Sequence, residues 1–255
     1  MTANTGAQNS RPTADNPSLA EQGRDAEGRN ITSERRLYMQ LLAFGDVNDT
    51  EKLIQAVEYS GIHGTLYMDV NDPRGVAFVT AHTNPDFFVN SWRTFLNRSP
   101  FAELTIKHEY TMLGRTYAIG YESDLEHILI NRPLHRICNP DWPWAVWYPL
   151  RRSGMFEKLP KEEQRDILME HGRQGAEFSA AGHGYDIRLA CHGLDRNDND
   201  FVVALVGPEL HPLSAMVQAM RKTRQTSEFL TNLGPFLVGK IIWHTPFERY
   251  LERIL

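Results

Sequence analysis

Apolar segments and amphipathic segments alternate along the chain in an order that occurs twice. In the first half, apolar stretches predict strands and helical spacing predicts helices, with strands at 36–44, 62–70 and 75–81 and helices at 50–59 and 85–97. The same reasoning in the second half predicts strands at 144–148, 185–192, 200–206 and 236–243 and helices at 160–178 and 213–221. The order strand, helix, two strands, helix in each half predicts a duplicated ferredoxin-like α+β unit.

This pattern divides the chain into three segments. Residues 1–33 contain almost no large apolar side chains, so they cannot offset the entropy of ordering, and we expect a disordered tail. Residues 34–137 form the expected N-terminal unit without a cofactor, and residues 138–255 form the expected C-terminal unit. A sheet covered by helices on one face can curl so that its other face lines a barrel, and a barrel mouth is a normal place for a cofactor.

Composition narrows the class of protein. Of the 255 residues, 41% are hydrophobic, which is ordinary for a globular protein with a core. The net charge of −5 and the lack of a dense basic run give no reason to expect nucleic acid. Cys138 and Cys191 stand far apart, which indicates no disulfide framework and favours a reducing, cytoplasmic location. We expect neither a secretory signal nor a membrane span.

His171 is the first candidate for a chemical role. The helix that begins after Pro160 places Ile167 and Leu168 on one side of this histidine and Gly175 on the other. An imidazole between apolar and small residues suits the proximal ligand of a flat, apolar macrocycle such as haem. On this helix alone, a core histidine that is hydrogen-bonded to the backbone is the simpler interpretation.

A series of segments in the C-terminal half changes that balance. In chain order they are Trp147-Tyr148-Pro149-Leu150-Arg151-Arg152, Leu159 to Arg165, Glu170-His171-Gly172, Gly193-Leu194-Asp195, Asp200-Phe201, Met220-Arg221 and Gly234 to Gly239. In order and approximate spacing, this series resembles the chlorite dismutase superfamily, which includes the coproheme decarboxylases of bacterial haem synthesis. No single segment is diagnostic, and the N-terminal half matches in architecture alone.

The resemblance implies a fold, a ligand and an assembly. The two units would form a dimeric α/β-barrel subunit, with haem b or iron coproporphyrin III bound in the C-terminal barrel. The histidine of the Glu-His-Gly segment is the family's proximal iron ligand, so His171 becomes the expected metal ligand. The family usually forms homopentamers, and in some members hexamers or dimers, so we expect a homo-oligomer and favour a pentamer.

Tyr148 selects a branch within the family. The sequence resembles the coproheme decarboxylases in its Tyr-Pro pair, whose tyrosine becomes the radical that attacks the propionate, whereas chlorite dismutases typically have an aliphatic residue there. The alternative is an aromatic residue that lines the barrel with its hydroxyl satisfied. Arg152 takes the place of a lysine common in the decarboxylases and could hold a propionate, with Arg151 facing outward. Arg132 and Arg136 are weaker candidates for that task.

The residue on the opposite, distal side of the porphyrin has three candidates. Asp186 matches the family's distal position and could act as a base towards peroxide. Arg188 faces the same side of the strand, and His183 could fold over the haem from a loop. Alternatively, Asp186 and Arg188 pair with each other. For the partner of the proximal histidine, the nearest match to the family's glutamate is Gln225, with Glu228 one turn on.

These observations predict an enzyme. The leading hypothesis is a peroxide-dependent coproheme decarboxylase that converts iron coproporphyrin III to haem b, with the porphyrin and hydrogen peroxide as its substrates. The first alternative is a chlorite dismutase or haem peroxidase that uses Arg188. The others are a haem-binding protein without turnover and a duplicated ferredoxin-like domain without haem.

Overall fold

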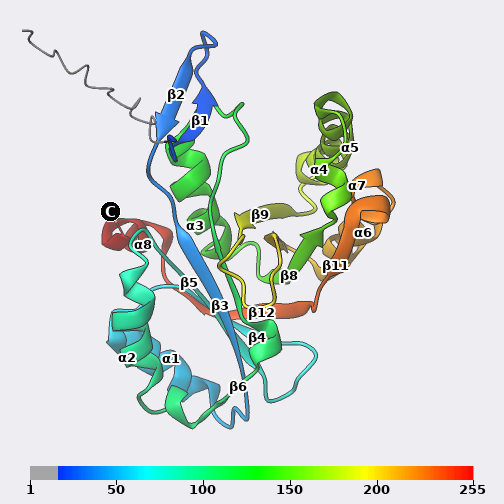
Figure 1. Cartoon of the computed structure of the whole chain (residues 1–255). Coiled ribbons are helices and arrows are strands. Elements are labelled where there is room, and N and C mark those ends of the chain that lie inside the picture. Colours follow the sequence, from blue (N-terminus) through cyan, green and yellow to red (C-terminus); the bar gives the residue numbers. More distant parts are fainter. Residues whose placement is uncertain (1–16, 255) are drawn as a thin grey trace, which may run out of the picture.

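The computed structural model describes residues 17–254, so residues 1–16 of the predicted tail lie outside the described part. The described part of the N-terminal half contains three α-helices and several strands (Figure 1). Its strands are β1 (Glu21–Arg24), β2 (Asn30–Ser33), β3 (Tyr38–Gly45), β4 (Thr65–Asp69), β5 (Val76–His82), β6 (Thr105–Ile106) and β7 (Met112–Arg115). Its helices are α1 (Thr50–Ser60), α2 (Arg93–Leu96) after a π-helical turn (Phe88–Trp92), and α3 (Arg132–Ile137) after a second such turn (His127–Asn131).

The C-terminal half repeats the strand and helix order. Its strands are β8 (Trp144–Arg152), β9 (Tyr185–Ala190), β10 (Phe201–Gly207), β11 (Leu230–Leu233) and β12 (Leu237–His244). Its helices are α4 (Gly154–Glu157), α5 (Lys161–Ala180), α6 (Leu210–Met220), α7 (Arg224–Phe229) and α8 (Phe247–Ile254). Every strand and helix predicted from the apolar pattern is present, within a few residues of its expected ends, so the duplicated α+β fold is confirmed.

The main sheet closes on itself. Its strands follow the order β10, β9, β7, β3, β5, β4, β12, β8, and β8 pairs antiparallel with β10 to complete the ring. The two halves meet where β12 pairs with β4 and where Arg115 of β7 pairs with Ala190 of β9. The result is a barrel built from both halves.

The inside of this barrel is solid. Side chains from both halves pack there in one cluster, among them Met39, Leu41, Tyr67, Ala77, Val79, Ala145, Trp147, Ile187, Leu189, Val202 and Ala204. This packing gives no support to the expectation of a cofactor inside the barrel. Apolar side chains on the inner face of every strand leave no room for one.

Helices cover the outer face of each half. In the N-terminal half, α1 and α2 enclose an aromatic cluster formed by Phe44, Phe78, Trp92, Phe95 and Phe101. In the C-terminal half, the equivalent layer lies between the outer face of β8, β9 and β10 and the helices α5 and α6 (Figure 1). No helix of the described chain is both long enough and apolar enough to span a bilayer.

The expectation of disorder is wrong for residues 17–33. Strands β1 and β2 form an antiparallel hairpin, with Glu21 opposite Ser33, that projects beside α3 (Figure 1). A Cβ on Gly23 would lie 2.3 Å from the carbonyl oxygen of Glu122, so the hairpin packs closely on the chain. This hairpin is held by polar contacts and by close packing of backbone on backbone. A pattern of apolar residues reveals neither, so the sequence looked disordered.

Candidate functional site

A cavity of about 240 Å³ lies in the outer layer of the C-terminal half. Strands β8, β9 and β10 form one wall, and helices α5, α6 and α7 form the other. The polar residues at its surface are Tyr148, His171, Ser179, Asp186, Arg188, Arg221, Gln225 and Thr226. The cavity thus brings together four of the six predicted site residues.

Strand register explains why Tyr148, Asp186 and Arg188 share one wall of the cavity. Arg188, Val203 and Tyr148 lie opposite one another across β9, β10 and β8 and form one row. Asp186 begins the next row, two residues along β9. Because side chains alternate between the faces of a strand, both rows point to the outer face while their neighbours fill the barrel.

His171 reaches the cavity from α5, on the opposite wall. Its Nδ1 atom lies 3.0 Å from the Thr223 Oγ1 atom, and that hydroxyl donates to the carbonyl oxygen of Met220 at 2.8 Å. A carbonyl oxygen only accepts, so the single hydroxyl proton of Thr223 is committed to Met220. The imidazole must then donate from Nδ1, which leaves Nε2 unprotonated and able to bind a metal or accept a proton.

The prediction that Gln225 or Glu228 is the hydrogen-bond partner of His171 is therefore wrong. Thr223 takes the place foreseen for Gln225 or Glu228. Gln225 lines the cavity, and Glu228 pairs with Arg224 at 3.2 Å on the surface. Thr223 joins α6 to α7 and lies far from His171 in sequence, so no pattern in the sequence indicates their contact.

The surroundings of His171 keep the imidazole neutral and one side of it open. Burial, followed by the positive charges of Arg152 and Arg188, lowers the pKa of His171 below its ordinary value. Gly172 and Gly175 both line the cavity. A Cβ on Gly175 would lie 3.1 Å from the Met220 Cε atom, so the glycine makes room for that flexible side chain.

Tyr148 is buried on the opposite wall. Its ring stacks on Phe236, with centroids 4.8 Å apart and planes at 28°. Burial raises the pKa of the Tyr148 phenol well above its ordinary value, and the negative charge of Asp186 acts in the same direction. The phenol therefore stays protonated. Tyr148 lines the cavity, and its hydroxyl forms no hydrogen bond with a side chain in residues 17–254.

Asp186 and Arg188 form the pair that the sequence left as an alternative. The Arg188 Nε atom lies 2.8 Å from Asp186 Oδ2, and Arg136 Nη1 lies 3.3 Å from Asp186 Oδ1 and also donates to the Asp186 backbone carbonyl. Burial alone would raise the pKa of Asp186, but Arg188, Arg136 and Arg132 together lower it. The acid is thus ionised and fully engaged. His183 lies outside the cavity, where its ring packs against Phe178.

Arg152 and Arg132 do not line the cavity, but their charges act on two residues that do, His171 and Asp186 respectively. The Arg152 guanidinium is held between the rings of Phe156 and Phe201, 4.4 and 5.1 Å from their centroids. Its buried Nε atom has no hydrogen-bond partner in the described part of the chain. Burial lowers the pKa of Arg132, and Asp186 opposes that effect. Arg132, Arg136, Arg152 and Arg188 together are called the arginine cluster below.

Tyr117 lies within reach of this cluster, and sequence reasoning missed it. Its ring packs on Phe201 at 5.8 Å. Burial raises the pKa of Tyr117, and the charges of Arg188 and Arg152 oppose that rise. Arg221, which belongs to one of the segments that match the family, also lines the cavity.

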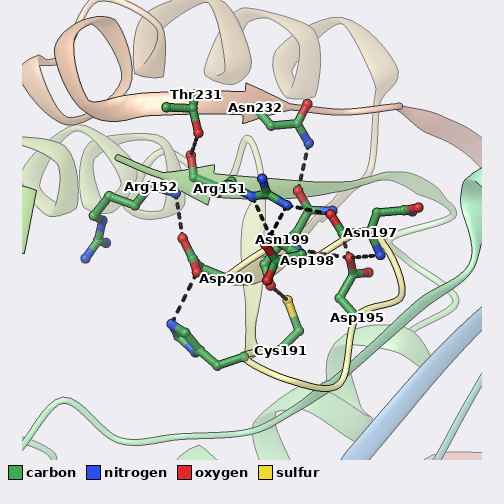
Figure 2. Close-up of polar contacts among 11 residues, drawn as sticks. Arg151, Arg152, Cys191, Asp195, Asn197, Asp198, Asn199, Asp200, Thr231 and Asn232 are labelled. Atoms are coloured by element: carbon green, nitrogen blue, oxygen red, sulfur yellow. Dashed lines mark hydrogen bonds and ion pairs between the residues drawn. The ribbon is translucent and has the colours of Figure 1, made fainter. Parts of the chain in front are cut away.

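Arg151 has a different task from its neighbour. Figure 2 shows its guanidinium turned onto the 195–199 loop, while Arg152 points away from that loop. Arg151 donates to the carbonyl oxygens of Asp198 and Asn197 at 2.6 and 2.7 Å. The Asp195 carboxylate accepts from Asn197 and Asn199 within the same loop (Figure 2). Arg151 therefore points away from Arg152 and the cavity, and it orders a loop.

Comparison with known proteins agrees with this architecture. The chain shares its fold with a haem-binding protein from Thermus thermophilus, with a TM-score of 0.64 and 18% identity over 87% of this chain and 97% of the other. It shares the fold equally with a mutant chlorite dismutase from Candidatus Nitrospira defluvii in complex with cyanide, with a TM-score of 0.64 and 16% identity over 87% and 96% of the two chains. No curated protein matches the chain. The family model described as chlorite dismutase matches residues 51–242, well over half of the sequence, and the chain therefore belongs to the chlorite dismutase family.

Proposed function

We propose that this protein is a peroxide-dependent coproheme decarboxylase, which converts iron coproporphyrin III to haem b in the cavity between the sheet and α5. One observation carries the proposal: the protonated Tyr148 phenol and the His171 imidazole face the same cavity from opposite walls. The arginine cluster beside them supplies positive charge for the carboxylates of a porphyrin. The haem-binding protein from Thermus thermophilus that shares the fold supports the same ligand class.

The residues present suit an iron porphyrin. Nε2 of His171 is the free, unprotonated nitrogen that axial iron ligation requires. Within residues 17–254, no group of three or more His, Cys, Asp or Glu side chains is arranged to hold a metal ion, so iron at this site has to arrive inside a macrocycle. The cavity of about 240 Å³ is smaller than most ligand pockets, and Met216 and Met220, which line it, are flexible side chains that can move aside.

The reaction balances with peroxide as the oxidant. A propionate that becomes a vinyl group releases carbon dioxide, one proton and two electrons. Hydrogen peroxide accepts two electrons and two protons, one of them from solvent, and becomes two molecules of water. The bound iron porphyrin supplies the redox chemistry that couples these two halves.

Tyr148 would carry the radical. Its raised pKa excludes a phenolate at neutral pH, so oxidation has to remove a proton and an electron together. The resulting neutral radical can take a hydrogen atom from the propionate, which removes one proton and one electron. The carboxylate can then leave as carbon dioxide when the second electron also passes to the oxidant derived from peroxide. Burial and the Phe236 stack hold the ring in place and keep water from quenching the radical.

The arginine cluster would hold the carboxylates. Arg152 has a buried Nε donor without a partner in the described residues, so a bound carboxylate would satisfy it. Arg132 is the second candidate. Among the charged neighbours of Arg132, Asp186 has the largest effect on its pKa. We also propose a homo-oligomer, with the family's pentamer as the expected assembly, which light scattering can check.

A chlorite dismutase or haem peroxidase is the second candidate, and the position of Arg188 at the cavity surface favours it. Such an enzyme needs a cation that is free to hold an anionic oxidant. Here the Asp186 carboxylate engages the Arg188 guanidinium at 2.8 Å and offsets its charge. For that reason we rank this function second.

The decisive experiment loads the purified protein with iron coproporphyrin and adds hydrogen peroxide in steps. Mass spectrometry should show stepwise loss of carbon dioxide until haem b forms. Unaltered iron coproporphyrin, or its destruction without a decarboxylated product, would rule the decarboxylase function out. Tight binding without turnover of iron coproporphyrin, and without oxygen release from chlorite, would leave a haem-binding protein as the remaining interpretation.

A further inference from the structure

The β1–β2 hairpin is anchored to the segment that carries Tyr117. The Glu21 carboxylate lies 2.9 Å from Arg115 Nη1 through one oxygen and accepts from the Ala118 backbone N–H at 2.9 Å through the other. Arg115 and Ala118 flank Tyr117 in sequence. A single carboxylate thus grips the chain on both sides of this tyrosine.

A second set of contacts holds the rest of this segment, residues 115–122, which is called the connection below. The Arg24 backbone N–H donates to the Glu122 carbonyl oxygen at 3.0 Å, and Gly23 packs directly on that carbonyl. The Glu122 carboxylate accepts from the backbone N–H groups of Ile119, Gly120 and Tyr121 at 3.0–3.1 Å. The tip of the connection is thereby folded onto the residue that the hairpin fixes.

The tip of the connection, residues 119–121, has little apolar contact of its own. Ile119 and Tyr121 are exposed, with 52% and 70% of their surface accessible. A segment with few buried apolar contacts opens at low cost unless polar contacts hold it. The Glu21 side chain, in contrast, is only 12% exposed, so its charge-assisted bonds are shielded from solvent.

Tyr117 links this anchoring to the candidate site. Its ring packs on Phe201, and the ring of Phe201 also lies against the Arg152 guanidinium. The charges of Arg188 and Arg152 act on the pKa of the Tyr117 phenol. If the connection moves, the packing of Tyr117 on Phe201 changes, and with it the surroundings of the Arg152 guanidinium. A cluster that has to be rebuilt on binding has a lower affinity for its ligand than one that is already formed.

We infer that Glu21 is a positioning residue and that the N-terminal hairpin keeps the connection, with Tyr117, against the arginine cluster so that the site is formed before its ligand arrives. The ligand part of this inference rests on the proposed function. The fold therefore uses a segment outside both ferredoxin-like units to complete the carboxylate-binding side of the cavity.

The test compares variants of the full chain. Glu21→Ala removes both contacts, and Glu21→Gln keeps an acceptor for the Ala118 N–H but loses the charge that faces Arg115. Glu27→Ala is the matched control, because it removes the same charge from the hairpin turn, where the carboxylate is 64% exposed and pairs with Arg29. Amide hydrogen exchange at residues 117–121 reports the connection, and Soret titrations with iron coproporphyrin and with haem b report the site.

In Glu21→Ala we expect faster exchange at residues 117–121 and an affinity for iron coproporphyrin lower by about tenfold, or about 1.4 kcal/mol. The loss should be smaller for haem b, which carries fewer propionates, and Glu21→Gln should fall between Glu21→Ala and the wild type. Glu27→Ala should match the wild type.

Three results would overturn the inference. Unchanged exchange in Glu21→Ala would show that the hairpin does not hold the connection. Faster exchange with wild-type affinity for both porphyrins would show that the connection is not part of the site. Equal losses for both porphyrins, without recovery in Glu21→Gln, would indicate a general loss of stability. If the wild-type protein binds neither porphyrin, the proposed function itself fails, and the exchange data still decide what the hairpin holds.

Discussion

Replacing Thr223 by valine tests the hydrogen-bond chain behind His171. Valine keeps the branched shape of threonine and removes the one oxygen that accepts from His171 Nδ1 at 3.0 Å. The carbonyl of Met220 keeps its bond from the Thr223 backbone N–H at 3.1 Å, and the side chain of Thr223 does not cap α7, so the damage is confined to the imidazole.

The size of the effect can be worked from this contact. A buried donor left without its acceptor costs about 1–3 kcal/mol. The unbound imidazole can avoid that cost by moving its proton to Nε2, and iron binding then has to reverse the change. Loss of a comparable partner behind a metal ligand typically lowers affinity by about 10–100-fold. We therefore expect Thr223→Val to weaken iron porphyrin binding within that range.

A Soret titration measures this loss, with His171→Ala as the reference for complete loss of the ligand. Thr223→Ser retains the hydroxyl and should restore most of the affinity. Thr226→Val is the matched control, since Thr226 also borders the cavity and lies 3.5 Å from the Thr223 hydroxyl without touching His171. Wild-type affinity in Thr223→Val, or an equal loss in Thr226→Val, would refute the assigned hydrogen bond.

Three further outcomes can be stated. Tyr148→Phe should bind iron coproporphyrin with an affinity close to the wild type and fail to decarboxylate it, and haem b formation at the wild-type rate would remove the radical from this residue. The haem-loaded protein should release little or no oxygen from chlorite on an oxygen electrode, because the charge of Arg188 is offset, and sustained release that vanishes in Arg188→Ala would promote the second function. Burial, reinforced by two nearby arginines, lowers the pKa of His63 from 6.5 to about 4. The unfolded chain therefore takes up this proton first, so stability should fall as the pH drops from about 6.5 to about 4. His63→Gln should flatten that part of the curve of Tm against pH, and an unchanged slope would contradict the assignment.

The apolar pattern predicted the long elements of the fold and missed the short or polar ones. Strands such as β3 and β5 carry continuous apolar runs, which are strong local signals. The hairpin β1–β2 has four-residue strands with mostly polar side chains, so its sequence looks disordered. Closure of the ring depends on pairing between β8 and β10 and between β12 and β4, and no local pattern encodes such long-range contacts.

The site divides in the same way. Motif order indicated His171 and Tyr148, and strand alternation placed Asp186 and Arg188 on one face. Thr223 could not be predicted, because its contact with His171 depends on how α5 packs against α7. The cavity itself was misplaced, since the sequence shows that the strands are apolar but not which face of the sheet the partner half fills.

The helical layers of the two halves are packed to different degrees, and this difference affects the free energy of local unfolding in each half. Beneath α1 and α2 the layer is packed with aromatic rings, whereas the equivalent C-terminal layer contains a hollow of about 240 Å³ beside its apolar cluster. The twenty-residue helix α5 has only Ile167 fully buried among its side chains. Local opening should therefore begin where α5 leaves the sheet, while the N-terminal half stays closed. A ligand that fills the hollow stabilises this half in proportion to its concentration and affinity, so the supply of ligand would govern the protein's lifetime in the presence of proteases.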